Sequence, residues 1–297
     1  MSGTAPLTGE TVKHKKKKNS RFITTAKRVF RNKGAVVGLV VITVIILLAI
    51  LAPVIAPYGY AEMNIPKMFT RPNSEHWLGT DHVGRDILSR ILYGGRFSLQ
   101  IGFYATVIAI VFGVTIGAIA GYFGGLADNI IMRFVDILQA IPGMLLSIAV
   151  TTVLGAGLWE MSVALAIGNI STYCRILRGS VLTIRKSEFI DAAIADSTSH
   201  HRIIFSHIIP NAISPIIVQA TLGAANIILL ASSLSFIGMG IAPPNPEWGA
   251  MLSEGRSYIR DYSYLLISPG MAIALTVLSL NLLGDGLRDA LDPKQKR

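Results

Sequence analysis

The stretch AVVGLVVITVIILLAILAPVIA, from Ala35 to Ala56, decides the class of fold. It contains no charged side chain, and about 20 consecutive apolar residues are enough for a helix to cross the hydrocarbon core of a bilayer. Tyr58 and Tyr60 follow it, and aromatic rings of this kind favour the membrane interface. The stretch is too long and too far from the N-terminus for a cleaved signal peptide. The sequence therefore predicts a transmembrane helix over residues 34–57.

Five more segments can span a membrane. They are Phe97–Ala127, the stretch after Asp136 as far as Trp159, Met161–Leu182, His207–Pro246 and Tyr262–Gly284. In the Met161–Leu182 span only the part up to Cys174 is free of charge, so Arg175 and Arg178 must extend toward the headgroups. The whole chain is 52% apolar and 15% charged, whereas an ordinary soluble domain carries roughly 25% charged residues. This composition argues against a soluble enzyme and predicts an all-α, polytopic membrane protein with six transmembrane helices.

The distribution of basic residues predicts the orientation of these helices. With the N-terminus inside, seven of the 27 Lys and Arg residues fall in outer segments and the other 20 in inner ones, which is the bias that retains loops in the cytoplasm. The predicted organisation is a basic cytoplasmic tail (1–33), the first transmembrane helix (34–57), an extracellular loop (58–96), a five-helix core (97–286) and a cytoplasmic C-terminal tail (287–297). The Lys15–Lys18 run is expected to contact anionic membrane lipids rather than nucleic acid.

The most informative inner segment is SEFIDAAIADSTSHHRIIFSHIIPN, Ser187–Asn211. It predicts two short helices with a break at Asp196 and Ser197, the first capped by Ser187 and the second capped by a residue between Ser197 and Ser199. Ile203, Ile204 and Ile208 fall on one side of the second helix. These features fit either a docking site for a partner protein or an amphipathic helix at the membrane surface.

This segment resembles the "EAA" loop of permease subunits of ATP-binding-cassette (ABC) importers, through Asp191-Ala192-Ala193, Ser197 and Ile208-Ile209-Pro210-Asn211. In that family the loop docks into the cytoplasmic ATPase. The resemblance thus implies a coupling loop over 187–210, with these site residues: Glu188, Asp191, Ala192, Ala193, Ser197 and Pro210. Aspartate stands where glutamate is usual, and Ser197 stands where glycine is usual, which puts a left-handed turn there in doubt.

Three more stretches narrow the resemblance to the second, C-type permease of peptide and nickel importers. They are HWLGTDHVGRDILSRILYGGRFSL (His76–Leu99), LSFIGMGIAPPNPEWGAMLSEGR (Leu234–Arg256) and NLLGDGLRDALDPK (Asn281–Lys294). Together with the loop they imply the type I ABC-importer permease fold in the cytoplasmic membrane of a prokaryote, with both termini cytoplasmic. The implied partners are a homologous permease subunit, two cytoplasmic ATPase subunits and an extracellular solute-binding protein. The expected function is import of di- and oligopeptides by ATP-driven alternating access, and nickel or a metal chelate is the alternative cargo.

Other features bear on the chemistry of the chain. It has no G-x-x-x-x-G-K-[ST] motif, so we expect no catalytic residues and no cofactor here, with ATP and Mg on the partner ATPases. Histidines and carboxylates between Glu75 and Asp86 lack the spacing of a metal site. Matching broken helices that would indicate a stand-alone secondary transporter are not visible. Uncharged polar residues in the spans are candidates for the translocation path, namely Asn169, Gln219, Asn226 and Ser233. Gly113, Gly117 and Gly121 share one helix face and predict close helix packing.

Overall fold

The computed structural model describes residues 26–291. The Lys15–Lys18 run and the end of the predicted C-terminal tail lie outside the described residues. Within them the regular elements are helices. The longer ones are α2 (Lys33–Ile55), α3 (Ile87–Phe123), α4 (Gly125–Ala140), α5 (Gly143–Leu154), α6 (Leu158–Ile184), α9 (Ile209–Phe236) and α11 (Tyr264–Leu291). The shorter ones are η2 (Ile65–Lys67), α7 (Glu188–Ala195), α8 (His200–Arg202), η3 (Ile203–Ile208), α10 (Trp248–Gly255) and η4 (Arg256–Tyr258).

Helix α2 is the first predicted span. The Asn32 side chain caps it by accepting a hydrogen bond from the Ala35 N–H, at 3.2 Å. The helix is apolar on all sides, which suits a segment surrounded by lipid and other helices. It packs closely against α11, because a Cβ on Gly38 would lie 2.5 Å from the backbone oxygen of Ser279. The N- and C-terminal spans are therefore neighbours in the fold.

Helix α3 begins earlier than the sequence predicted. Its first residue is Ile87, inside the segment expected to be an extracellular loop, and the Asp86 side chain caps it by accepting from the Ser89 N–H. The charged and polar residues of its first turns, such as Arg90, are buried against other outer segments instead of facing lipid. A helix can therefore start before the charge-free stretch that begins at Phe97.

The third predicted span is not a single helix. Helices α4 and α5 meet at 90° across the break at Ile141 and Pro142. Proline lacks the N–H that a continuing helix would use, and it forces the preceding residue out of the helical region. Ile141 accordingly has an extended backbone. The prediction of one continuous helix from Asp136 to Trp159 was wrong because it counted apolar residues and passed over this proline.

Four helical segments of the described chain are long and apolar enough to cross a membrane: α2, α3, His200–Phe236 and α11. The bent pair α4–α5 raises the number to five if it forms one span. Helix α6 is 27 residues long but is not among the helices apolar enough to cross a membrane. It contains three charged residues, Glu160, Arg175 and Arg178. The chain is thus an all-helical polytopic membrane protein with four or five such spans, and the sixth stays a prediction.

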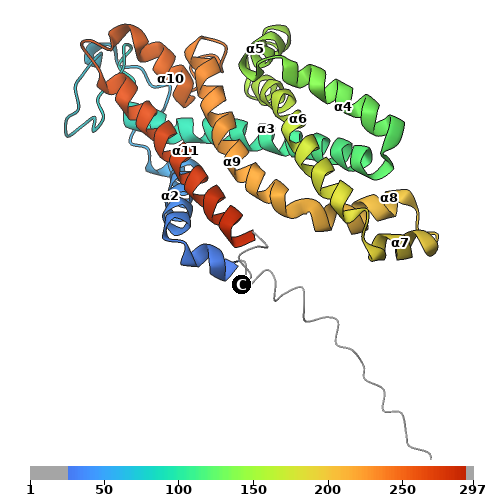
Figure 1. Cartoon of the computed structure of the whole chain (residues 1–297). Helices are drawn as coiled ribbons and strands as arrows, with labels where there is room; N and C mark the ends of the chain where they lie inside the picture. Colours follow the sequence, from blue (N-terminus) through green and yellow to red (C-terminus); the bar gives the residue numbers. More distant parts are fainter. Residues whose placement is uncertain (1–25, 292–297) are drawn as a thin grey trace, which may run out of the picture.

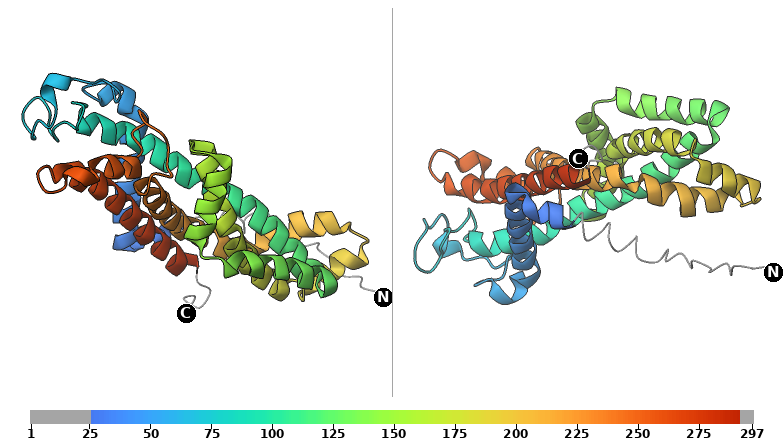
Figure 2. Two further views of the ribbon diagram at one scale, coloured as in Figure 1. Left: turned by 90° about the horizontal axis from the view of Figure 1, so that it is seen from above. Right: turned by 60° about the horizontal axis from the view of Figure 1, so that its bottom comes forward.

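The core lies where α3, α6 and α9 meet. Their buried apolar residues include Ile101, Leu165, Leu177 and Ile227. The predicted glycine face of α3 is confirmed, because a Cβ on Gly117 would lie 2.4 Å from the backbone oxygen of Cys174 in α6. Figures 1 and 2 show α7 and α8 at one end of the molecule, whereas α10 and the loop before α3 lie at the other.

Candidate functional site

Helix α7 presents the residues expected to contact a partner. Glu188, Asp191 and Ala192 are exposed, and the two carboxylates stand in the first turn, where they complement the helix dipole. Ala193 is half-buried, and Ile190 is fully buried and anchors the helix on the core. Ser187 occupies the N-cap position with an extended backbone, but its side chain makes no capping hydrogen bond. The predicted side-chain cap was therefore wrong.

The end of α7 shows how serine fits where the resemblance expects glycine. Ser197 has a φ of 56°, in the left-handed region. Its N–H donates to the Ile194 oxygen at 3.0 Å, and the N–H of Thr198 donates to the Ala193 oxygen at 3.1 Å. This pair of bonds is a Schellman motif, which satisfies carbonyls at a helix end. The left-handed turn is therefore present. Because Ser197 has a Cβ atom, this conformation is sterically less favourable for it than for glycine.

The second half of the loop leads directly into α9. Helix α8 begins after Ser199 and continues as a π-helix, η3, in which Ile203, Ile204 and Ile208 are buried as predicted. Pro210 is the second residue of α9. Because η3 continues directly into α9, Pro210 lies inside a continuous helical segment, His200–Phe236, where it has no N–H for a helical hydrogen bond. The π-helix was not predicted, because its wider hydrogen-bonding pattern has no sequence signature of its own, although such segments often occur at functional sites.

The loop is tied to the inner end of α3. The Tyr122 hydroxyl and His200 Nδ1 are 2.7 Å apart, and the Phe123 ring packs against the same imidazole with 5.8 Å between the centroids. Sequence reasoning missed this contact, since the hydrogen-bonded pair is separated by 78 residues. The loop therefore contacts α3 in addition to continuing into α9.

Three of the four candidate path residues share one face of α9. Gln219, Asn226 and Ser233 recur at every seventh position, a spacing that returns to nearly the same side of a helix. Asn226 is exposed, and the other two are partly exposed. Asn169 lies on α6, where its amide nitrogen donates to the Leu165 oxygen at 2.9 Å. The structure therefore places three of the residues on one face of α9 and Asn169 on the neighbouring helix α6, one turn before Tyr173, whose hydroxyl donates to the Gln219 backbone oxygen at 3.4 Å.

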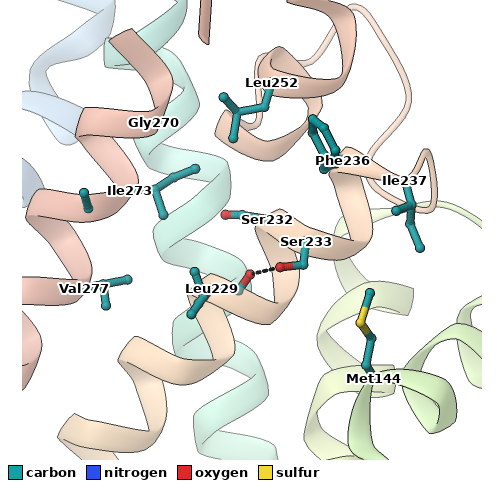
Figure 3. A pocket seen from close by; sticks show the side chains of 11 residues that line it. Met144, Leu229, Ser232, Ser233, Phe236, Ile237, Leu252, Gly270, Ile273 and Val277 are labelled. Carbon is teal, nitrogen blue, oxygen red and sulfur yellow. Dashed lines mark hydrogen bonds between the residues drawn. The ribbon is translucent and has the colours of Figure 1, made fainter. Parts of the chain in front are cut away.

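Two cavities open along this face of α9. The first has a volume of about 790 Å³ between α6, α9 and α11. Its wall includes the polar residues Gln219, Asn211 and Ser180 and the charged residue Arg288 of α11. The second, of about 480 Å³, lies between α5, α9, α10 and α11. Figure 3 shows Ser233 in its wall, with its hydroxyl bonded to the Leu229 oxygen, and Met144 of the bent pair opposite Ile237. Asn226 lies between the two cavities along the helix.

Buried charges hold together the end of the molecule that was predicted to be extracellular, which we call the outer end. Arg85 donates to Asp81 at 2.6 Å and to Glu254 of α10 at 2.7 Å, and Arg90 donates to Glu254 at 2.9 Å. Both arginines are almost fully buried. Ligand atoms of Asp81, His82 and Glu254 come within 4.8 Å of one another, but both carboxylates already bind guanidinium groups. The cluster is therefore an ion-pair network that fixes the outer loop to α10.

Glu247 caps α10 and connects it to α3. Its carboxylate accepts from the Gly249 and Ala250 N–H groups at 3.0 and 2.8 Å, and from the Ser98 hydroxyl of α3 at 3.1 Å. Burial raises the pKa of Glu247, and these hydrogen bonds oppose the rise. The Trp248 indole adds a hydrogen bond to the Ile91 oxygen at 3.0 Å. Helix α10 is therefore fixed to α3 at the outer end of the second cavity.

Comparison with known proteins places these features in a family. The family model described as "binding-protein-dependent transport system inner membrane component" matches residues 113–297. A second model, the N-terminal transmembrane domain of oligopeptide transport permease C, matches residues 20–72. The dipeptide transport system permease protein DppC of Alkalihalophilus pseudofirmus is 49% identical over 91% of this chain and 89% of its own length. The glutathione transport system permease protein GsiD of Pectobacterium atrosepticum is 48% identical over 76% of this chain and 75% of its own.

Solved structures show the same fold at greater distance. The inward-facing MetNI methionine ABC transporter contains a chain that superposes with a TM-score of 0.55, covering 68% of this chain and 96% of that one at 18% sequence identity. At this identity the likeness concerns the fold alone.

Proposed function

Because the chain belongs to the family of binding-protein-dependent transport system inner membrane components and is the permease subunit of an ABC importer, we propose that it forms half of a translocation path for di- and oligopeptides. It is a multi-pass inner membrane protein and not an enzyme. The relatives named as dipeptide, di/tripeptide and glutathione transport permeases support peptides as the cargo. A homologous permease subunit would supply the other half of the path.

The main support for this proposal is the polar face of α9. Gln219, Asn226 and Ser233 offer hydrogen bonds without a fixed charge, so this face of α9 suits peptides with different side chains. Arg288 of α11 adds a positive charge to the wall of the first cavity. The two cavities that flank Asn226 provide room beside that face. Asn169 of α6 is proposed as a further path residue, because its bond to the Leu165 oxygen, like the bond of Ser233 to the Leu229 oxygen, uses only part of its hydrogen-bonding capacity. The proposed six spans are α2, α3, the α4–α5 pair, α6, α9 and α11.

The proposed energy input is at the loop of α7 and α8. Glu188, Asp191 and Ala192 form an exposed surface for an ATPase subunit, and ATP with Mg would be bound by two such partners. Closure of the ATPases on ATP would move the loop, and the contacts of His200 with Tyr122 and of η3 with α9 would transmit that movement to two core helices. The spans would then open outward and accept the peptide from an extracellular binding protein.

The experiment changes the loop in the complete, reconstituted transporter. Ala192→Trp adds a large ring to a surface proposed to be closely packed, where overpacking costs about 1 to 3 kcal/mol, and Asp191→Lys places a positive charge in the first turn of α7. We expect both variants to insert normally in the membrane and to lose about tenfold or more of dipeptide uptake, because ATPase binding is weakened by a corresponding 1.4 kcal/mol. Uptake of labelled dipeptide and co-purification of the ATPase are the measurements.

Matched controls come from the opposite end of the molecule. Ala61→Trp and Asp261→Lys make the same changes at exposed outer positions and should leave ATPase binding unchanged. Normal uptake and normal ATPase binding in both loop variants would refute the coupling site. Uptake of nickel but of no dipeptide by the unmodified transporter would refute the proposed cargo and leave the coupling site standing.

A further inference from the structure

A second kind of groove lies on the side of α9 opposite its polar face, where Ala224 and Ile228 contribute to its wall. It has a volume of about 430 Å³ between α2, α3, α9 and α11. Ile42, Ile46 and Ala49 form its α2 wall, and Phe103, Ile228 and Leu280 contribute from the other helices. These side chains are all apolar. The groove is therefore suited to a hydrocarbon chain.

One end of the groove is polar. Arg96 and Gln100 line it there, and they stand one turn apart on the same side of α3. Arg96 is the last charged residue before the uncharged stretch of α3. One turn before it, Tyr93 packs against Tyr60 with 5.0 Å between ring centroids, and paired tyrosines are typical of the membrane interface. Arg96 therefore stands at the depth of lipid headgroups.

The charge of Arg96 is available to a ligand. Its side chain is exposed, and among residues 26–291 no carboxylate forms an ion pair with it. Its neighbours Arg85 and Arg90, in contrast, are both paired and buried. A guanidinium group binds a phosphate through two parallel N–H donors. We propose that this groove binds one anionic phospholipid, with its phosphate on Arg96 and an acyl chain along α2.

The arrangement distinguishes this site from general lipid contact. Elsewhere the exposed side chains of α2, such as Val40 and Val44, are apolar and offer a lipid headgroup no ionic contact of their own. In the groove the cation and the apolar wall meet in one concave site, and a ligand must carry both an anion and a hydrocarbon chain. A soluble phosphate lacks the chain, and a zwitterionic lipid offsets the attraction with its own positive charge.

The test uses the complete transporter in nanodiscs of phosphatidylcholine containing phosphatidylglycerol as a minor component. Lipid retained after detergent extraction is identified by native mass spectrometry. We expect the unmodified protein to retain phosphatidylglycerol in preference to phosphatidylcholine, and Arg96→Gln to reduce that preference about tenfold, as expected for one charge-assisted phosphate contact. Arg96→Lys keeps the charge and should keep most of the preference. Inorganic phosphate in the buffer should not displace the lipid.

Two further variants distinguish lipid binding in the groove from a general attraction between anionic lipids and the positive charges of the protein. Ile46→Trp fills the apolar wall without changing charge and should also abolish the preference, whereas Arg260→Gln removes an exposed outer cation away from the groove and should not. An equal loss in Arg260→Gln, or no preference in the unmodified protein, would overturn the proposal. So would efficient capture of the homologous permease by a photo-crosslinker at Ile46, because the groove would then be a contact between subunits.

Discussion

Ser197 shows how a single residue sets the geometry of the coupling loop. The Schellman motif at the end of α7 requires a left-handed residue, and Ser197 adopts it with a φ of 56°. For a residue with a Cβ this conformation costs roughly 1 to 2 kcal/mol. The hydrogen bonds of the turn and the burial of Ile190 and Ile203 hold the residue in place. The sequence pattern predicted the break between the two helices. Only the structure showed that Ser197 adopts the left-handed conformation there.

Replacing Ser197 with glycine should therefore stabilise the loop. We expect Ser197→Gly to slow hydrogen exchange in the peptide that covers α7 about fivefold, because relief of the left-handed strain outweighs the greater chain entropy of glycine by about 1 kcal/mol. Ser199 has an extended backbone with a φ of −61°, so Ser199→Gly relieves nothing and should exchange at the same rate or faster. Faster exchange in Ser197→Gly than in the unmodified transporter would show that the turn is not strained.

At the scale of the helices, the fold depends on how closely α3 and α6 approach. Three glycines on one face of α3 allow that approach, and at Gly117 the neighbour is the backbone of Cys174, which cannot rotate away. Close packing of this kind replaces the hydrophobic effect as the main source of helix association within a bilayer. Local sequence spacing was sufficient to predict the glycine face, but the identity of its partner helix came only from the structure.

Gly117→Ala should therefore destabilise the core despite the higher helix propensity of alanine. The added Cβ would lie 2.4 Å from the Cys174 oxygen, and overpacking of this kind costs about 1 to 3 kcal/mol. Gly179 of α6 has nothing within 4 Å of its Cβ position, so Gly179→Ala should be neutral or stabilising by up to about 1 kcal/mol. The apparent melting temperature of the purified transporter measures both. Equal melting temperatures for the two variants would mean that α3 and α6 can separate at little cost.

At the scale of the whole molecule, the open question is how many times the chain crosses the membrane. The bent pair α4–α5 either crosses the membrane once or re-enters and returns to the side where it began. In the first case the connection before α6 lies on the opposite side of the membrane from the start of α4, and in the second case it lies on the same side. The 20 to 7 distribution of Lys and Arg favours six crossings, with α7 and α8 inside. Figure 1 places α7 and α8 far from the outer loop, as that topology requires.

Cysteine labelling distinguishes these topologies. Cys174 is the only cysteine and is buried, so a Cys174→Ser background can carry single cysteines at the exposed positions Ser74, Ala156 and Ser199. With six spans, an impermeant reagent should label Ser74→Cys and Ala156→Cys in intact cells, and Ser199→Cys only after lysis. Protection of Ala156→Cys in intact cells would make α4–α5 a re-entrant pair. Labelling of Ser199→Cys from outside would remove α7 from the cytoplasm, and protection of Ser74→Cys in the same experiment would show that the whole orientation is inverted.

Local sequence determined the class of fold and much of the loop. The spans of α2, α3, α9 and α11 follow from the length of their uncharged runs, because a bilayer imposes that length on any helix that crosses it. The two short helices of the loop follow from the break at Asp196 and Ser197, whereas neither Ser187 nor Ser199 makes the predicted side-chain capping hydrogen bond. Even the bend at Pro142 had a local signal, which the count of apolar residues concealed.

The tertiary structure alone decided which of these elements meet. The partnership of Arg85 and Arg90 with Glu254, and the contact of His200 with Tyr122, join residues far apart in the chain. The polar residues of α9 were path candidates from sequence, but the cavities beside Gln219 and Ser233 are formed by α5, α6, α10 and α11 and came only from the packing of those helices. The physical reason is that hydrophobic length and helix signals act between near neighbours in sequence, whereas a shared surface depends on how distant helices pack.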